Sequence, residues 1–524
     1  MSQFPPVVIA IVLATVVIAI TALGRKLPIP SPILQVAAGG LIGLLPGVEI
    51  PQLDPDIVFF VFLPPILWAA AFFTSLREFR ANLRPISFLA IGLVIVTTLA
   101  IAVVARMLIP GLPWAVAVAL GAIISPPDAV AATAIVSRLP VPRRVIVILE
   151  GESLVNDASA LVLYRTAVAA AVTGAFSWGE SVVRFFIDAG VGSMIGLLVG
   201  WVIIAAVKRT RDPLAEVLAT LAGPYLAWVA AETVHVSAVL ACVAGGLYTR
   251  QHLSTVVSPV SRIQARAVWD LFVFVLNALI FLILGAQFGG LIAAVPPESL
   301  RSIAITGLVL TAVAVVVRLI WVPVATWGPR WLSAEVRRTE PVPRPRAVAL
   351  VAWTSMRGIV SLATAFALPL ALSDGTPFPF RSELILITMV VILMTLVVQG
   401  FTLAPLVSWM QFAPEHEHRN EERIARREMA RRAAEALEDQ AREKGVDRAD
   451  VDWLRTELKE RNRESDRAGG SAEGRRQLRL HMIGAQRRML VRLRNEGAIS
   501  DEVLSTIERE LDFDAIRVGG GEER

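Results

Sequence analysis

The residues best suited to chemistry stand in the stretch LEGESLVNDASALVLY, residues 149–164. In a helix, Ser153 and Asp157 lie one turn apart on the same face, and Glu152 and Asn156 share the neighbouring face. Oxygen atoms of carboxylates, hydroxyls and amides are the ligands that small hard cations prefer. Two carboxylates in one turn exceed what helix packing needs, so the stretch predicts an ion or proton site. The alternative is a polar seam that only joins two helices.

A further carboxylate, Asp128, directly follows Pro126 and Pro127 in the apolar stretch GAIISPPDAV, residues 121–130. Proline has no N–H, so an α-helix is expected to break here. Broken helices inside membrane proteins offer carbonyl groups and half-helix ends as ion ligands where they line a cavity. The break and Asp128 therefore predict part of an ion site. A proline kink in which Asp128 only caps the second half-helix is the alternative.

Two arginines lie inside apolar runs, Arg318 in VVVRLIWV and Arg357 in TSMRGIVSLA. A buried guanidinium without a partner is costly, so each is expected to pair with a carboxylate. Glu152 is the natural partner for one of them, which leaves Asp157 to bind and release a proton.

The charged candidate residues stand in apolar runs, and helices that cross a membrane would bring them together. The 524-residue chain is 55% hydrophobic, and its apolar runs are confined to residues 1–410. Most runs are long enough for a hydrocarbon core of about 30 Å. They predict an all-α polytopic membrane protein with about thirteen transmembrane helices, at residues 5–23, 29–46, 56–74, 85–109, 112–137, 145–173, 181–207, 213–232, 235–249, 267–293, 301–326, 347–372 and 382–410.

Basic residues are concentrated in the loops that follow the odd-numbered spans, which places those loops in the cytoplasm. The N-terminus is then outside and the C-terminus inside, as expected for a multi-pass protein of a plasma membrane, here a bacterial inner membrane. The predicted domains are a membrane transport domain, residues 1–410, and a charged helical cytoplasmic tail, residues 411–524. The tail balances Arg with Glu and Asp, as solvated helices do.

Composition also argues against several classes of function. The net charge of +5 is accounted for by the topology signals, so no nucleic-acid partner is expected. The single Cys242 excludes an internal disulfide framework, and the five histidines form no cluster within the spans. We expect no cofactor and no enzymatic activity.

The motif GESLVND, residues 151–157, followed by an apolar run, is similar to the signature of monovalent cation–proton antiporters, in the branch of NhaP-type and eukaryotic sodium/proton exchangers. The resemblance covers essentially all of residues 1–410. Other matching stretches follow in order: FLPPILWAAAF (62–72), HVSAVLACVAGGL (235–247), FVLNALIFLILGAQF (274–288), Arg318 and MRGIVSLATAFALP (356–369).

The resemblance implies a role for each candidate residue. Asp157 resembles the essential carboxylate that takes either the proton or the cation, which is Na⁺, K⁺ or Li⁺. Ser153, Asp128 and the main-chain carbonyl of Pro127 resemble its co-ligands. Asn156 stands where electrogenic relatives carry a second aspartate, and this pairing resembles the electroneutral class.

The resemblance also implies an architecture. By this resemblance, Glu152 is expected to form a salt bridge with Arg318, and Arg357 is expected to lie in a second broken helix that crosses the first. The family fold has two inverted repeats, with a dimerisation domain and a mobile core domain that work as a homodimer by an elevator-like movement. The chain departs from the family in one stretch, where it has Pro126-Pro127-Asp128-Ala129 and family members commonly have Ala-Thr-Asp-Pro. A threonine hydroxyl is therefore missing from the expected ligand set.

Two other functions compete with antiport. An ion-coupled symporter of an organic solute uses similar broken helices, but it needs a roomier cavity with more polar and aromatic contacts. An intramembrane aspartyl protease uses two aspartates that share a proton. Asp128 and Asp157 could be such a pair, but the chain has no GxGD motif.

Overall fold

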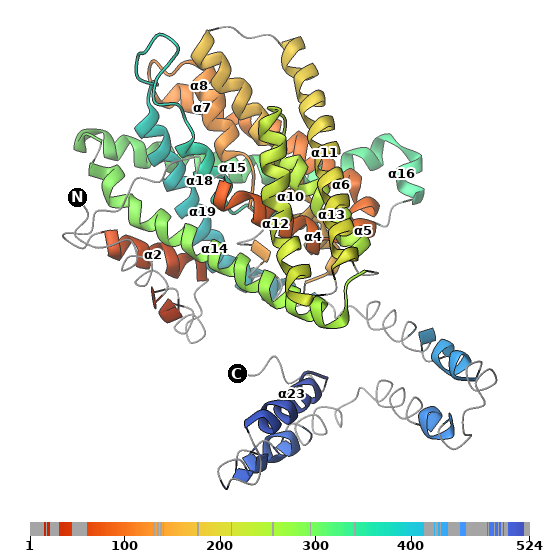
Figure 1. Cartoon of the computed structure of the whole chain (residues 1–524). Coiled ribbons are helices and arrows are strands. Elements are labelled where there is room, and N and C mark those ends of the chain that lie inside the picture. The colour runs from red at the N-terminus through yellow and green to blue at the C-terminus, as the bar shows by residue number, and fades with distance from the viewer. Residues whose placement is uncertain are drawn as a thin grey trace. The chain divides into compact units, whose positions relative to one another are not determined.

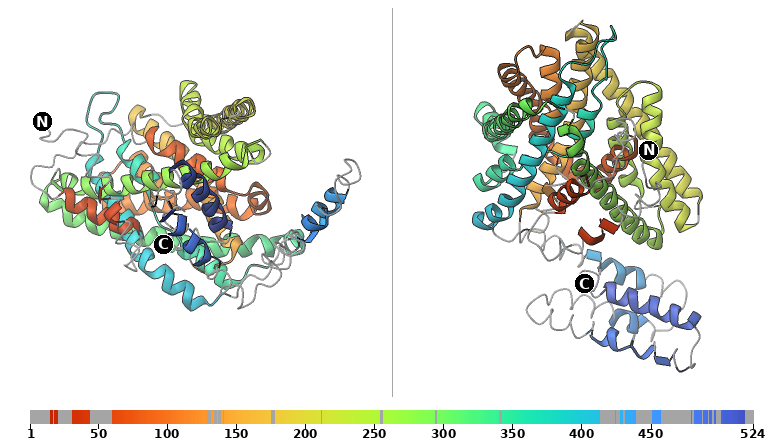
Figure 2. Two further views of the ribbon diagram at one scale, coloured as in Figure 1. Left: turned by 60° about the horizontal axis from the view of Figure 1, so that its bottom comes forward. Right: turned by 90° about the vertical axis from the view of Figure 1, so that its left-hand side faces the viewer.

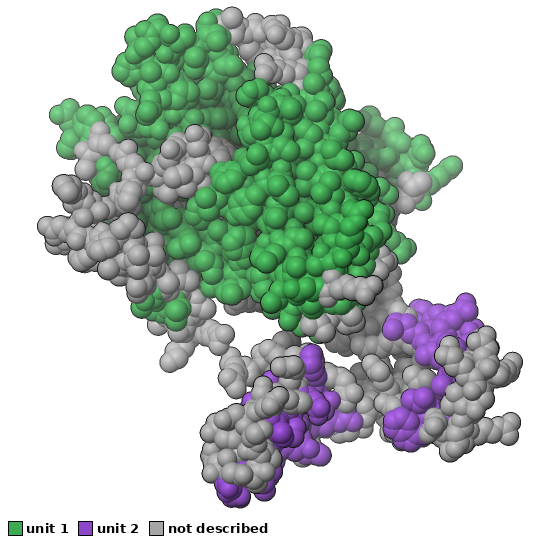
Figure 3. Space-filling model, viewed as in Figure 1, with its two compact units in different colours: residues 1–413 green, residues 414–524 purple. Residues whose placement is uncertain are grey.

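A computed structural model of the chain divides into two compact units, residues 1–413 and residues 414–524, which Figure 3 colours separately. In the first unit the structure describes residues 31–43, 60–128, 141–174, 178–210, 212–253, 256–293, 295–339 and 342–412, with short pieces of 15–20 and 132–139. In the second unit it describes pieces of 424–456 and 479–496, and all of 501–517.

The regular secondary structure of the described residues in the first unit is helical, apart from an isolated β-bridge between Ala371 and Pro377 (Figure 1). In chain order the helices are α2 (Ser31–Gly43), α4 (Leu63–Phe73), α5 (Leu76–Ala81), α6 (Leu83–Ser87), the π-helix η1 (Phe88–Leu93), α7 (Val94–Leu108), α8 (Trp114–Ile124), α10 (Arg143–Thr173), α11 (Trp178–Arg209), α12 (Pro213–Thr233), α13 (Ala238–Leu253), α14 (Pro259–Ala293), α15 (Pro297–Leu332), α16 (Ala334–Thr339), α17 (Pro345–Trp353), α18 (Ile359–Phe366) and α19 (Arg381–Met410).

The predicted all-α membrane fold is confirmed within these ranges. Six of the described helices are long and apolar enough to cross a membrane, and α2, α4 and α8 are shorter apolar helices. Each predicted span after the first has a helix in its range, whereas most of the first span, 5–23, lies outside the described residues. At 31 residues α10 is also long enough to cross, but it carries the polar cluster of GESLVND, which lowers its hydropathy.

The helices of the first unit pack in two groups. One group joins α2 to α14, α4 and α11 to α13, and α12 to α11, α13 and α14. The other joins α8 to α7 and α10, and α15 to α7, α17 and α19. The helices α2 and α14 lie side by side (Figure 1 and Figure 2). Their backbones touch at Gly39, where a Cβ atom would stand 1.9 Å from the carbonyl oxygen of Leu282. Such small-residue contacts are typical of helix pairs in membranes, where van der Waals packing drives association.

The second unit contains helical segments of high charge, including α23 (Asp501–Arg517). Within it, Arg431 forms ion pairs with Glu428 and with Glu435, the latter at 2.7 Å. These pairs lie three and four residues apart on exposed helical faces, where solvent screens the charges and the pairs add little to the stability of the helix.

Candidate ion-binding site

The first broken helix is α8, which ends at Ile124 just before the two prolines. Pro126 cannot donate to the carbonyl of Ala122, which instead accepts a hydrogen bond of 3.3 Å from the Ser125 hydroxyl. The chain then runs without helical structure through Pro127 to Asp128. The predicted break is therefore present, and local side chains satisfy part of the freed backbone.

The second broken helix consists of α17 and α18, which residues 354–358 separate. Side chains of α19 replace the helical partners of this segment. The N–H of Ser355 donates to Gln399 Oε1 at 2.9 Å, and the N–H of Arg357 donates to Thr395 Oγ1 at 3.1 Å. Sequence reasoning missed Thr395 and Gln399. Their signal was a pair of polar residues four apart, on one helical face of a largely apolar span.

The two breaks meet and are joined by two hydrogen bonds, one between backbone groups and one from a side chain to the backbone. In an unbroken helix the N–H of Asp128 would donate to the carbonyl of Ile124. Here it donates to the carbonyl of Met356 in the second break, at 2.6 Å. The carbonyl of Ile124 accepts instead from Nε of Arg357, at 3.0 Å. The second break therefore supplies both of the partners that the first break lost.

Helix α10 brings the polar motif to this crossing. The amide nitrogen of Asn156 donates to the carbonyl of Pro127 at 2.8 Å, which fixes the orientation of the amide. Its Oδ1 atom is buried and has no hydrogen-bond partner within the described residues. The neighbouring Asp157 is 6% exposed, and the described part of the chain holds no hydrogen bond or ion pair to its carboxylate. Ser153, one turn earlier, and Asp128 are both half-buried.

The expected pairing of Glu152 with Arg318 is present. Both side chains are 1% exposed, and they form a bidentate pair in which Nη2 donates to Oε2 at 2.7 Å and Nη1 donates to Oε1. Nε of Arg318 donates to the carbonyl of Val351 in α17, at 3.1 Å. A buried pair of this geometry satisfies both charges, and breaking it by removing one partner is strongly destabilising. Arg318 of α15 therefore links α10, through Glu152, to the second broken helix, through Val351.

The expectation that Arg357 would pair with a carboxylate is wrong for the described residues. Its guanidinium is buried and donates to the carbonyl of Ile124 and to the carbonyl and hydroxyl of Ser355. The two breaks leave carbonyl oxygens without helical partners. These oxygens accept the hydrogen bonds that the guanidinium would otherwise donate to a carboxylate. Arg357 therefore stabilises the crossing itself.

The chain resembles known proteins over most of its length. The family model "Sodium/hydrogen exchanger, transmembrane" matches residues 11–409. An uncharacterized Na⁺/H⁺ exchanger of Mycobacterium tuberculosis (strain H37Rv) is 35% identical over 98% of this chain and 96% of its own length. A sodium, potassium, lithium and rubidium/H⁺ antiporter of Bacillus pumilus is 32% identical over 94% of this chain and 75% of its own.

A solved structure shares the fold. The sodium proton antiporter MjNhaP1 of Methanocaldococcus jannaschii superposes with a TM-score of 0.59 at 19% identity, over 76% of this chain and 98% of that one. The family match spans the two broken helices and the polar motif of α10 that lies against them. The chain belongs to the sodium/hydrogen exchanger family.

Proposed function

We propose that the protein exchanges a monovalent cation for a proton across the bacterial inner membrane, with Asp157 as the shared binding group. The observation that carries the proposal is the position of Asp157, a buried carboxylate without a protein partner among the described residues, beside two broken helices. The family relationship supports the same reaction. The Bacillus pumilus relative is named for transport of sodium, potassium, lithium and rubidium, so Na⁺, K⁺ and Li⁺ are all candidate substrates.

The exchange needs only competition for one carboxylate. A bound proton neutralises Asp157, and a bound monovalent cation compensates the same single charge. The empty carboxylate is costly to move through a low-dielectric barrier, so the site moves loaded and exchange is obligatory. One cation is traded for one proton, which makes the cycle electroneutral. The neutral amide of Asn156 supports this stoichiometry, since it adds no second titrating carboxylate at that position.

The proposed cation ligands are the side chains of Asp157, Asp128 and Ser153, and the main-chain carbonyl of Pro127. A carbonyl oxygen has two lone pairs, so Pro127 can accept from Asn156 and still face an ion. Oδ1 of Asn156, which has no hydrogen-bond partner among the described residues, is a further oxygen beside Asp157. It would make up for the hydroxyl that is lost where the family commonly has threonine.

We infer an elevator-like movement of a core domain, with the group of α7, α8, α10, α15 and α17–α19 as the core. Glu152, Arg318 and Arg357 hold this group together, so that it moves as a unit. The group of α2, α4 and α11–α14 would be the dimerisation domain of a homodimer. The N-terminus would lie outside, and residues 411–524 would form a cytoplasmic tail.

The experiment uses purified protein in liposomes that contain a pH dye. Na⁺, K⁺ or Li⁺ is added outside, with the membrane voltage held at zero and then at a fixed value. Entry of the cation in exchange for internal protons makes the interior more alkaline, so the dye should report a rise in internal pH. Electroneutral exchange predicts that the rate of this rise is the same at both voltages.

Two outcomes would contradict the proposal. A strong dependence of the rate on voltage would exclude one-for-one exchange and the proposed part of Asn156. Absence of proton movement with every cation, together with uptake of an organic solute, would assign the symport reaction instead.

A further inference from the structure

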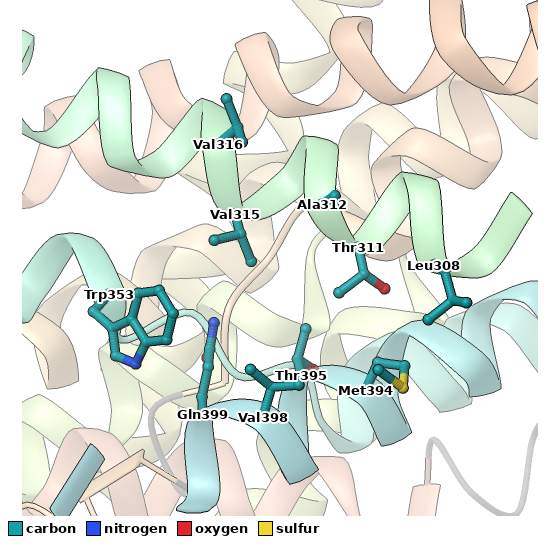
Figure 4. Close-up of a pocket in the computed structure, with 10 residues that line it drawn as sticks. All are labelled: Leu308, Thr311, Ala312, Val315, Val316, Trp353, Met394, Thr395, Val398 and Gln399. Atoms are coloured by element: carbon teal, nitrogen blue, oxygen red, sulfur yellow. The ribbon is translucent and has the colours of Figure 1, made fainter. Parts of the chain in front are cut away.

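A groove lies between α15 and α19, next to Trp353 at the end of α17. Its volume is about 270 Å³, and its lining includes Thr311, Ala312, Val315, Trp353, Val398 and Gln399 (Figure 4). Leu308, Val316 and Val398 of its lining are exposed. Because α15 and α19 are both long and apolar enough to span a membrane, a bilayer would place lipid chains at the opening of the groove. Its described lining contains no charged side chain, and a charged ligand is therefore disfavoured.

One hydrogen-bond donor in the groove is unused. Gln399 is 1% exposed, and its Nε2 atom has no hydrogen-bond partner among the described residues. The orientation of the amide is fixed, because its Oε1 accepts from the N–H of Ser355 at 2.9 Å. Figure 4 shows the amide nitrogen directed from α19 into the groove, towards α15. A buried amide donor without an acceptor is destabilising, so an acceptor from the ligand would be stabilising.

The other polar groups of the lining are already engaged. The hydroxyl of Thr311 donates to the carbonyl of Gly307 at 2.7 Å. Nε1 of Trp353 donates to Thr402 Oγ1 at 3.1 Å. The hydroxyl of Thr395 donates to the carbonyl of Ile392 at 3.0 Å. Within the described lining, the groove therefore offers an apolar wall and one free donor, which is the pattern of a small-molecule site with a single orienting polar contact.

We propose that the groove binds the acyl chain of a neutral ester from the bilayer, with the ester carbonyl accepting a hydrogen bond from Nε2 of Gln399. The acyl chain supplies the apolar surface that the groove covers, and the carbonyl satisfies the buried amide. Because Gln399 and Thr395 also hold the second break, an occupied groove stiffens the segment that carries Arg357. The site is distinct from the proposed cation ligands, and binding there does not depend on the proposed exchange.

The test uses two photoreactive probes with the same chain and the same diazirine, one a methyl ester and the other the corresponding alkane. Full-length protein in liposomes is labelled with each probe, and the labelled peptides are located by mass spectrometry. Both probes are expected to label residues of the groove on α15 and α19. A single neutral hydrogen bond predicts that the ester labels them about three- to tenfold more than the alkane.

Three variants separate the groove from the rest of the surface. Ala312→Leu adds atoms inside the groove and is expected to reduce labelling by both probes by about fivefold or more, since the added side chain fills the space that the probe would occupy. Ala304→Leu adds the same atoms to an exposed position of α15 outside the groove lining, and labelling is expected to be unchanged. Gln399→Met is expected to abolish the preference for the ester and to keep labelling by the alkane.

Three results would overturn the proposal. These are absence of labelling in the groove, equal labelling of wild type by both probes, and equal labelling of Ala312→Leu and wild type. The Ala312→Leu comparison leaves Gln399 and its bond to Ser355 intact, so it decides the question even if Gln399→Met fails to fold.

Discussion

The carboxylate of Asp128 lies directly against the backbone of Gly358. A Cβ atom added at Gly358 would stand 1.6 Å from Oδ2 of Asp128 and 2.8 Å from its Cβ. The two residues are far apart in sequence and belong to the two different breaks. Glycine at 358 is therefore what allows the first break to approach the second closely enough to exchange hydrogen bonds with it.

Gly358→Ala is expected to destabilise the protein by about 1–3 kcal/mol and to reduce exchange, because the added methyl group overlaps the Asp128 carboxylate. Thermal unfolding in detergent measures the first effect, and the liposome assay measures the second. The control is Gly328→Ala, where a Cβ meets nothing within 4 Å. The double variant Gly358→Ala with Asp128→Gly should regain stability without regaining exchange. If the single variant is as stable as wild type, the close approach is wrong.

Asp157→Asn is expected to abolish exchange, because an amide can neither take a proton nor balance the charge of a cation. Asp270→Asn is the matched control, since Asp270 is exposed and its ion pair is with Arg266 of the same helix, at 3.6 Å. Proton flux in liposomes is the measurement. Full exchange by Asp157→Asn would falsify the proposed mechanism.

Asn156→Ala is expected to lower the rate of exchange without abolishing it. The substitution removes the hydrogen bond to the Pro127 carbonyl and the proposed ligand oxygen Oδ1, but it leaves Asp157 in place. The loss of one ligand oxygen should also raise the cation concentration needed for half-maximal exchange. A titration of the rate against Na⁺, K⁺ and Li⁺ measures both effects, and an unchanged titration would remove Asn156 from the site.

Glu152→Gln is expected to destabilise the protein by about 3–5 kcal/mol, because it leaves the Arg318 guanidinium buried without its charge partner. The double variant Glu152→Gln with Arg318→Met should recover much of that loss. Arg165→Gln is the control, because the Arg165–Glu232 pair is exposed and about 0–1 kcal/mol is expected there. Equal effects of the buried and the exposed substitution would contradict the structural role of Arg318.

Thr395→Val is expected to cost about 1–3 kcal/mol, because the buried N–H of Arg357 loses its acceptor while the side-chain volume is nearly kept. Thr388→Val is the matched control on the same helix. Thr388 is also buried, but its hydroxyl donates to the carbonyl of Leu384 in its own helix, at 2.8 Å. Unfolding in detergent compares the two, and a larger effect at Thr388 would count against the role of α19.

The sequence by itself was sufficient to predict the membrane fold and to identify the charged residues that are buried in it. In hydrocarbon, an apolar run of about 20 residues satisfies its own backbone hydrogen bonds as a helix. The runs between 29 and 410 therefore predicted the helices found in the described ranges. Burial of charge in a membrane is similarly costly, which is why Glu152, Asp157, Arg318 and Arg357 are recognisable as candidates from their apolar sequence surroundings alone. Pro126 and Pro127 marked the first break because proline lacks the N–H that a helix requires.

Only the tertiary structure decided which groups form hydrogen bonds with the freed N–H and carbonyl groups of the two breaks. The second break has no proline, and its N–H groups depend on Thr395 and Gln399 from another helix. Sequence spacing gave no reason for Arg357 to bind carbonyl oxygens instead of a carboxylate. Those oxygens become available only where two interrupted helices cross, which is a relationship between segments 233 residues apart. The residue types in a short stretch can predict where a helix must stop. The hydrogen-bond partners of the backbone groups freed there come from distant segments, and only the packing of those segments decides which they are.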